Sequence, residues 1–262
     1  MKDSKVQRVP AVLRGLQILE LLAGPQKRWT TSEISRKLKF PKSTTSYLLR
    51  TLLASGYLVR EEEGVYRLGM KLLALGGQAL RGLELREVAL PSLRRLTLET
   101  QTTAHLAVLE GSESVYIERV PSPGFIQLDT WVGRRMPLHS TSVGKALLGF
   151  LPPEEAETLF QSMSLPRYTP RTIVSLSRLK HELQKVRESG VAIDNEENTP
   201  GVRCIAAPIF GANGRVLAAL SLTGPVQQVT EAGMSTIIAK VTDAARRLTL
   251  ALGGRPPEFK IV

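Results

Sequence analysis

A run of hydroxyl-bearing side chains follows the proline at position 41 and lies between basic residues. The segment reads Lys42-Ser43-Thr44-Thr45-Ser46-Tyr47. Serine and threonine compete with a helix backbone for hydrogen bonds, so a purely structural helix has little use for four in succession. On DNA, the same groups can donate to phosphates and base edges. The side chains that we expect to contact DNA are Lys42, Ser43, Thr44, Ser46, Tyr47 and Arg50.

Three short helices are predicted around this segment. Apolar residues recur at helical spacing over residues 11–23, and a Gly-Pro pair ends the pattern. Thr30 and Glu33 have the spacing of a capping box, which predicts a second helix that ends near Leu38. The hydroxyl run then begins a third helix that extends to Ala54. In a helix-turn-helix, the second helix of the motif enters the major groove, and here that helix carries the hydroxyl run.

A β-hairpin is predicted directly after the third helix. Residues 57–60 and 65–68 are strand-like, and three glutamates and a glycine connect them. The three helices and the hairpin predict a winged helix-turn-helix over residues 1–69. The glutamates should repel phosphate, so we expect the wing to stay off the DNA or to contact it through flanking arginines. Candidate phosphate or minor-groove contacts are Lys2, Lys5, Arg8, Arg60 and Arg67. A winged helix that docks on a protein is the alternative.

The excess of positive charge lies in the same part of the chain. The 262 residues include 35 Lys+Arg and 24 Asp+Glu, a formal net charge of +11. Residues 1–82 hold 15 basic and 6 acidic residues, a net of +9, and residues 83–262 hold the other 20 and 18, a net of +2. Such clustering favours a polyanionic partner over a basic surface that only confers solubility.

The rest of the chain alternates between helices and strands, which predicts an α+β domain over residues 83–262 joined by a linker helix over 70–82. The predicted strands cover 102–109, 115–120, 125–132, 191–194, 203–210 and 215–223. The predicted helices cover 70–81, 85–100, 141–151, 154–163, 176–189 and 230–252. Asn213-Gly214 predicts a type I′ turn between the last two strands.

Composition excludes several classes of protein. A single cysteine, Cys204, excludes an intramolecular disulfide and zinc fingers built on several cysteines. No apolar run approaches the roughly 18 residues that a membrane span needs. The first ten residues are polar and basic, unlike a signal peptide. We therefore expect a cytoplasmic protein with no membrane partner and no cofactor.

An enzyme or a metal-binding sensor domain fused to the winged helix is the alternative function. Residues 142–145 read Ser-Val-Gly-Lys, but a phosphate-binding loop would have glycine and a hydroxyl residue where His139 and Ala146 stand. The residues that could bind a metal, at no motif spacing, are His105, His139 and Cys204. The residues that could act as paired carboxylates, or as solvated charges of a loop, are Asp194, Glu196 and Glu197. We expect neither catalytic residues nor a metal site.

Three stretches make the chain resemble the IclR-type transcriptional regulators. The first contains Pro41-Lys42-Ser43-Thr44, followed by residues 48–52 and 56–58. The second is PLHSTSVGKA at 137–146. The third joins DNEE at 194–197, GVRCIAAPI at 201–209 and SLTGP at 221–225. The resemblance covers residues 9–253 and rests on the order and spacing of all three stretches.

This resemblance implies a winged helix, a linker helix and a GAF-like C-terminal domain that binds a small effector. It also implies homodimers, often paired as dimers of dimers on operator DNA, and it favours a repressor. The pocket residues that it implies are Ser142, Val143, Asp194, Cys204, Ser221 and Thr223, with the bulk of Val143 narrowing the pocket. The apolar lining that it implies comes from Phe125, Leu128 and Met136.

The chemistry of these pocket residues favours a small organic acid, with aromatic acids among the candidates. Hydroxyl and thiol groups, together with backbone N–H groups at a helix start, suit a carboxylate. Asp194 would repel that carboxylate unless it is protonated or bonds to a hydroxyl of the ligand. The bulk of Val143, Phe125 and Met136 disfavours a fully hydrophilic ligand such as glyoxylate.

DNA affinity should fall steeply as salt rises, because neutralised phosphates release their counterions. For about six phosphate contacts, we expect a loss of roughly 10³-fold between about 50 and 200 mM salt. Fluorescence anisotropy with a labelled duplex measures the slope. A salt-independent affinity would contradict a DNA contact carried by the basic N-terminal third.

Overall fold

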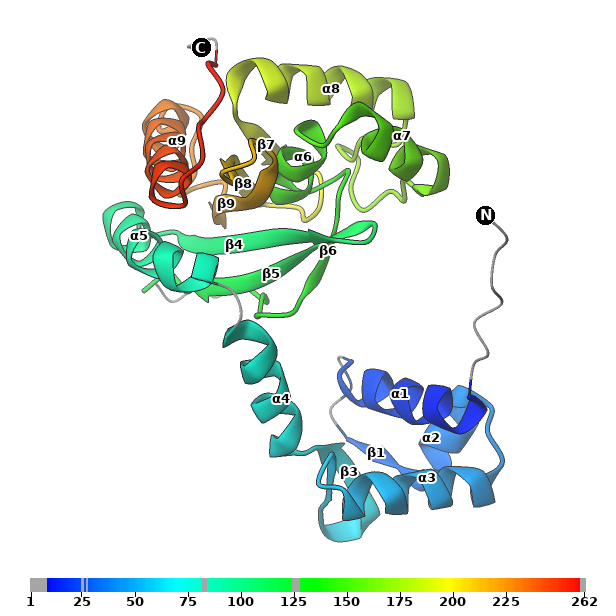
Figure 1. Ribbon diagram of the computed structural model, residues 1–262. Coiled ribbons are helices and arrows are strands. Elements are labelled where there is room, and N and C mark those ends of the chain that lie inside the picture. The colour runs from blue at the N-terminus through cyan, green and yellow to red at the C-terminus, as the bar shows by residue number, and fades with distance from the viewer. Residues whose placement is uncertain (1–8, 25, 27, 82–83, 124–127, 260–262) are drawn as a thin grey trace. The chain divides into compact units, whose positions relative to one another are not determined.

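Backbone contacts divide the chain into two units, Met1–Gly82 and Leu83–Val262 (Figure 1). The computed structural model describes residues 9–24, 26, 28–81, 84–123 and 128–259. Each unit has its own core, and each is described by itself below. No helix within these described ranges is long and apolar enough to cross a membrane.

The N-terminal unit is a winged helix-turn-helix followed by a fourth helix (Figure 1). Its helices are α1 (Pro10–Leu22), α2 (Thr31–Leu38), α3 (Lys42–Ala54) and α4 (Met70–Arg81). Its strands are β1 (Trp29–Thr30), β2 (Leu58–Arg60) and β3 (Val65–Leu68), which pair antiparallel in the order β1-β3-β2. The three predicted helices and the hairpin are confirmed. The two-residue strand β1 was not predicted, because it is too short to show a period of two.

The capping box at the start of α2 forms as predicted. The Glu33 backbone N–H donates to Thr30 Oγ1 at 3.4 Å, and the Thr30 backbone N–H donates to Glu33 Oε2 at 2.7 Å. The bond from the Thr30 backbone lowers the pKa of Glu33. Ile34 then packs into a core with Ile18 of α1 and Leu49 of α3. The cap therefore fixes the angle at which α2 enters this small core.

The C-terminal unit is built on a six-stranded antiparallel sheet with the strand order β6-β5-β4-β9-β8-β7. The strands are β4 (Thr103–Glu110), β5 (Glu113–Val120), β6 (Arg135–Pro137), β7 (Ala192–Asn195), β8 (Val202–Phe210) and β9 (Val216–Pro225). The helices are α5 (Glu84–Thr100), α6 (Ser142–Gly149), α7 (Pro153–Ser162), α8 (Leu176–Ser189) and α9 (Met234–Ala251). The expected mixed α+β class is confirmed.

Helices cover both faces of this sheet (Figure 1). Ala107, Ala206 and Ala219 point to one face, where they pack with Val143 and Leu147 of α6. Their chain neighbours Leu106, Ile205 and Leu220 are also buried, and successive residues of a strand point to opposite faces. The second face is covered by α5 and α9. Small alanines on the α6 face leave room between helix and sheet.

Two strand and turn predictions are wrong. No strand covers residues 128–132 of the predicted strand 125–132, and residues 124–127 lie outside the described part. Gly133 has φ +91° and breaks the extended chain, and the strand β6 begins only at Arg135. The turn at Asn213-Gly214 is not type I′, because only Gly214 has a positive φ and type I′ needs two.

The last helix begins later than predicted. The sequence pattern extends it back to residue 230, whereas α9 starts at Met234. The intervening residues 231–233 form a turn in which the Gly233 backbone N–H donates to Thr230 Oγ1 at 3.1 Å. A threonine hydroxyl that captures a nearby N–H offers the backbone an alternative to helix.

Replacing Thr30 with alanine should destabilise the N-terminal unit by about 1 kcal/mol, because the Glu33 N–H loses its cap. Urea unfolding followed by the fluorescence of Trp29 measures the change. Thr30→Ser keeps the hydroxyl and is the matched control. Equal destabilisation by serine and alanine would show that the hydroxyl is not the source of the effect.

Candidate functional site

One face of α3 carries most of the predicted DNA contacts. Lys42, Ser43, Tyr47 and Arg50 are exposed, and Tyr47 keeps 67% of its surface in solvent. The spacing of 43, 47 and 50 places these three side chains on one side of the helix. Leu48 and Leu49 on the other side enter the core. The face can therefore meet a groove without disturbing the fold.

The remaining hydroxyl residues of α3 are less accessible. Thr44 and Ser46 are half-buried, and Thr45 is fully buried. The Thr45 hydroxyl donates to the Pro41 carbonyl at 3.1 Å, so it serves the start of the helix. Thr44 lies away from the exposed face defined by Ser43 and Arg50, which makes it the weakest member of the predicted set.

The wing arginines are engaged within the protein. Arg67 forms an ion pair with Glu61 at 2.7 Å, and the Arg60 guanidinium lies 5.9 Å from the ring centre of Tyr66. The wing glutamates therefore neutralise part of the charge that flanks them. The other candidate phosphate contacts, Lys2, Lys5 and Arg8, lie outside the described residues.

A cavity of about 160 Å³ lies on the α6 face of the large sheet. Ligand pockets for drug-sized molecules span roughly 300–1,000 Å³, so this volume suits a small ligand. Six of the nine predicted effector residues line it: Leu128, Met136, Ser142, Asp194, Cys204 and Thr223. They come from chain segments far apart in sequence, and the sheet brings them together.

The other three predicted effector residues do not line this cavity. Val143 lies in the apolar cluster beneath α6. Ser221 is buried on β9, two residues before Thr223, and its hydroxyl has no hydrogen-bond partner within the described part of the chain. Phe125 lies outside the described residues. Val143 therefore supports the helix that borders the cavity rather than narrowing the cavity itself.

The sequence did not indicate a second set of lining residues. These are Tyr116, Asp129, Thr130, Arg134, Thr141, Asn198, Thr199 and Val202. Thr141 caps α6, where its Oγ1 accepts from the Gly144 N–H at 3.1 Å. Gly144 lets the helix approach closely, because a Cβ there would lie 2.5 Å from Leu138 Cα. Of these residues, Arg134 could have been found in the sequence. It is adjacent to Arg135, and successive side chains of a strand point to opposite sides, so one of the two arginines is expected to face inward.

A chain of polar contacts joins Thr130 and Thr223, two residues that line the cavity. Arg119 Nε donates to Thr130 Oγ1 at 2.9 Å, and the same oxygen lies 2.9 Å from His105 Nε2. His105 Nδ1 lies 3.5 Å from Thr223 Oγ1. Burial, together with the nearby arginines, lowers the pKa of His105 to about 3, so the ring is neutral. A neutral ring can link the two threonines, with one nitrogen donating and the other accepting.

Asp194 faces this chain from the edge strand β7. Its Oδ1 accepts from the backbone N–H groups of Glu197 at 2.7 Å and Asn198 at 3.3 Å. Burial raises the pKa of Asp194 to about 7, and the Glu197 N–H bond opposes that rise. Burial and the charge of Asp194 raise the pKa of the Cys204 thiol. The wall therefore offers a neutral thiol and a carboxyl group that titrates near neutral pH.

A fully buried lysine fixes the loop after Asp194. Lys145 Nζ donates to the Ile193 carbonyl and to Glu197 Oε1, each at 2.5 Å. Burial raises the pKa of Glu197, and the lysine opposes that shift. The sequence placed Lys145 in the stretch 137–146 that carries the family resemblance but assigned it no role. Its observed role is to tie α6 to the loop that supplies Asn198 and Thr199 to the cavity.

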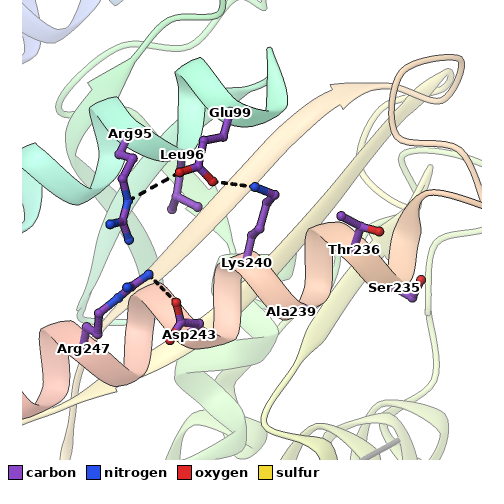
Figure 2. A pocket seen from close by; sticks show the side chains of 9 residues that line it. All are labelled: Arg95, Leu96, Glu99, Ser235, Thr236, Ala239, Lys240, Asp243 and Arg247. Atoms are coloured by element: carbon purple, nitrogen blue, oxygen red, sulfur yellow. Dashed lines mark hydrogen bonds and ion pairs between the residues drawn. The ribbon is translucent and has the colours of Figure 1, made fainter.

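A larger cleft between α5 and α9 has different chemistry (Figure 2). Its volume is about 650 Å³, and it opens to solvent. Figure 2 shows that its charged side chains pair with one another, Glu99 with Arg95 and Lys240, and Asp243 with Arg247. A surface whose charges already neutralise each other has little to offer an anion or a cation.

The candidate metal ligands are not grouped. Within the described ranges, no set of three His, Cys, Asp or Glu side chains could hold a metal ion. His139 Nε2 lies 3.0 Å from the Pro166 carbonyl, where burial lowers the pKa of the ring. His105 lies behind the cavity wall, next to the lining residues Thr130 and Thr223.

The stability of the protein should depend on the ionisation of Asp194. Its folded pKa of about 7 lies above its ordinary value of 3.8, so its contribution is full below about pH 4 and is lost as pH rises through 7. Asp194→Asn keeps the acceptor for Glu197 but does not ionise. Its melting temperature should therefore rise relative to wild type between pH 5 and 8, as measured by circular dichroism. Asp129→Asn, at an exposed carboxylate of the same cavity, is the control. Parallel pH profiles for Asp194→Asn and wild type would contradict the shift.

Comparison with known proteins extends over both units. A model described as the IclR helix-turn-helix domain matches residues 11–62, and one described as the C-terminal domain of the bacterial transcriptional regulator IclR matches residues 77–250. The regulator XynR of Escherichia coli strain K12 is 36% identical over 246 residues, which cover 94% of this chain and 98% of XynR. The transcriptional repressor AllR of Salmonella typhi is 34% identical over 248 residues, which cover 94% of this chain and 91% of AllR.

A solved structure with a ligand is also similar. The crystal structure of an IclR homologue from Microbacterium hydrocarbonoxydans, complexed with 4-hydroxybenzoate, is 31% identical and has a TM-score of 0.79. The match covers 92% of this chain and 98% of that one. The chain therefore belongs to the IclR family of transcriptional regulators, with an N-terminal helix-turn-helix and a C-terminal effector-binding domain.

Proposed function

We propose that the protein is a transcriptional repressor whose helix α3 binds operator DNA. A small hydroxylated organic acid that binds in the cavity regulates this DNA binding. The observation that carries the ligand class is the cavity wall, where Asp194, Cys204 and Thr223 offer polar groups in a small enclosed space. The 4-hydroxybenzoate bound to the Microbacterium homologue has the same combination of carboxylate and hydroxyl. The name of the AllR relative supports the repressor mode. Such a regulator acts in the compartment that holds the chromosome.

For α3, the contact set that we propose is Lys42, Ser43, Ser46, Tyr47 and Arg50, with Thr44 at its margin. An exposed arginine on a recognition helix can bind a guanine through two hydrogen bonds, whereas a lysine at the helix start suits a phosphate. For the effector, we propose the six lining residues Leu128, Met136, Ser142, Asp194, Cys204 and Thr223, with Ser221 beneath them and Phe125 from the adjoining segment.

We propose that two chains bind one operator as a homodimer, which can pair further as a dimer of dimers. The exposed side of α1 carries an apolar stripe of Val9, Val12, Leu13 and Leu16 at helical spacing. Met70 and Leu73 of α4 are also exposed. Contiguous apolar patches on a surface mark protein contacts. A two-fold pair of recognition helices also reads two half-sites, which a single short helix reads weakly.

We propose that effector binding acts on the loop after β7. Asp194, Asn198 and Thr199 line the cavity, and the same loop is tied to α6 by Lys145. A ligand that contacts both the loop and the start of α6 can favour one arrangement of the two over another. The binding of effector and the binding of operator DNA are then thermodynamically linked. The factor by which the effector changes the affinity for DNA must equal the factor by which DNA changes the affinity for the effector.

The DNA face is tested by selection from random duplexes followed by anisotropy with the selected operator. We expect two-fold related half-sites. Arg50→Ala should weaken binding by about 1–3 kcal/mol and relax specificity at one position, and Lys42→Ala should weaken binding evenly and reduce the salt slope by about 1. Arg178→Ala, an exposed arginine of α8, is the control. Variants at Asp194 and Cys204 should alter the response to effector. Operator affinity that ignores both Arg50 and Lys42 would exclude the α3 face.

A further inference from the structure

Two adjacent arginines stand where the chain enters β6, and their surroundings differ. Arg135 is exposed and forms ion pairs with Glu110 at 2.8 Å and Glu113 at 3.5 Å. Arg134 is half-buried and lines the cavity. Among the residues that the structure describes, no carboxylate lies within ion-pairing distance of Arg134. Extended chain points successive side chains to opposite sides, which accounts for the contrast.

Arg134 is held in place without using its charged donors. Its backbone N–H donates to the Trp131 carbonyl at 3.2 Å, and its own carbonyl accepts from the Tyr116 N–H at 3.1 Å. Its guanidinium carbon lies 4.8 Å from the ring centre of Trp131. A cation–π contact stabilises a guanidinium from one face and leaves its N–H edge available. The side chain is therefore ordered before a ligand arrives, which reduces the entropic cost of binding.

The second arginine near the cavity, Arg119, is occupied. Its Nε donates to Thr130 Oγ1 at 2.9 Å, and its Nη2 donates to the Leu128 carbonyl at 3.3 Å. Arg119 thus holds the 128–130 segment against the sheet. Of these two arginines, Arg134 is the one whose guanidinium N–H groups have no acceptor among the described residues.

Arg134 and Asp194 lie at opposite edges of the sheet but line the same cavity. Arg134 immediately precedes the edge strand β6, and Asp194 lies on the other edge strand, β7. Tyr116 lines the cavity from β5, which lies between β6 and β7 in the strand order. The cavity therefore has a cationic end and a carboxyl end, with Cys204 and Thr223 between them.

We propose that Arg134 binds the carboxylate of the effector and sets its direction, with a hydroxyl of the same ligand turned toward Asp194. A guanidinium matches a carboxylate with two parallel N–H···O bonds. The Asp194 carboxyl can accept from a hydroxyl or, when protonated, donate to one. Asp129 also lines the cavity, but its carboxylate is exposed. Water and salt therefore screen its attraction for Arg134, and it competes only weakly with the carboxylate of the ligand. This assignment rests on the proposed function and narrows its ligand class to small hydroxy acids.

The test compares acids with their uncharged amides by isothermal titration calorimetry on the full chain. The probes are 4-hydroxybenzoate with 4-hydroxybenzamide, and glycerate with glyceramide. Arg134→Gln should weaken binding of the acid by about ten- to hundredfold and leave the amide within about twofold. Arg134→Lys should recover part of the loss. Arg135→Gln, which removes the adjacent outward arginine, is the matched control and should leave acid binding within about twofold.

The outcomes separate this assignment from the proposed function. An acid that binds wild type and Arg134→Gln equally overturns the role of Arg134 and leaves the effector class intact. A loss that is equal for acid and amide also overturns it, because a merely structural role would affect both. If no acid in the panel binds wild type, the proposed ligand class fails, and the assignment fails with it.

Discussion

The C-terminal unit depends on one buried positive charge. Lys145 has no exposed surface, and burying an ammonium without compensation costs several kcal/mol. Compensation comes from the Ile193 carbonyl of β7 and from Glu197 in the loop after it, and Glu182 of α8 lies 3.7 Å from the ammonium. Helix α6 and this loop therefore have to meet, and the cavity is the space that they enclose against the sheet. Removing Lys145 would leave the buried carboxylate of Glu197 without its ion-pair partner.

The two sides of the cavity are held in different ways. The sheet floor is held by paired strands and by the chain of contacts through His105. The loop on the other side is held by the hydrogen bonds that Asp194 accepts and by the bond from Lys145 to Glu197. Burial raises the pKa of both carboxyl groups, Asp194 and Glu197. The charge of Glu197 adds to the rise in the pKa of Asp194, and the charge of Lys145 opposes it. Asp194 therefore connects the cavity to the loop that Lys145 ties to α6.

Local patterns predicted the N-terminal unit well. The capping box at Thr30 and the proline at position 41 each act within one turn of helix, so α2 and α3 have the predicted ends. The failures lie where distant contacts override local preference. Residues 128–132 are rich enough in β-formers to look like a strand, but Gly133 and the bonds from Arg119 hold them beside the cavity. Likewise, Thr230 captures an N–H that would otherwise extend α9.

The amino-acid sequence by itself determined the helix-turn-helix, the side chains that are exposed along one face of α3 and the location of the excess charge. Helical periodicity is a local property, so neighbours in sequence are neighbours on that face. The cavity was decided only by tertiary structure. Six of the residues that line it were expected from family resemblance. Strand pairing and register decided the rest: the positions of Lys145 and Tyr116, and the difference between Arg134 and its neighbour Arg135. Strand pairing joins residues tens of positions apart, and no local pattern records which residues will face one another across the sheet.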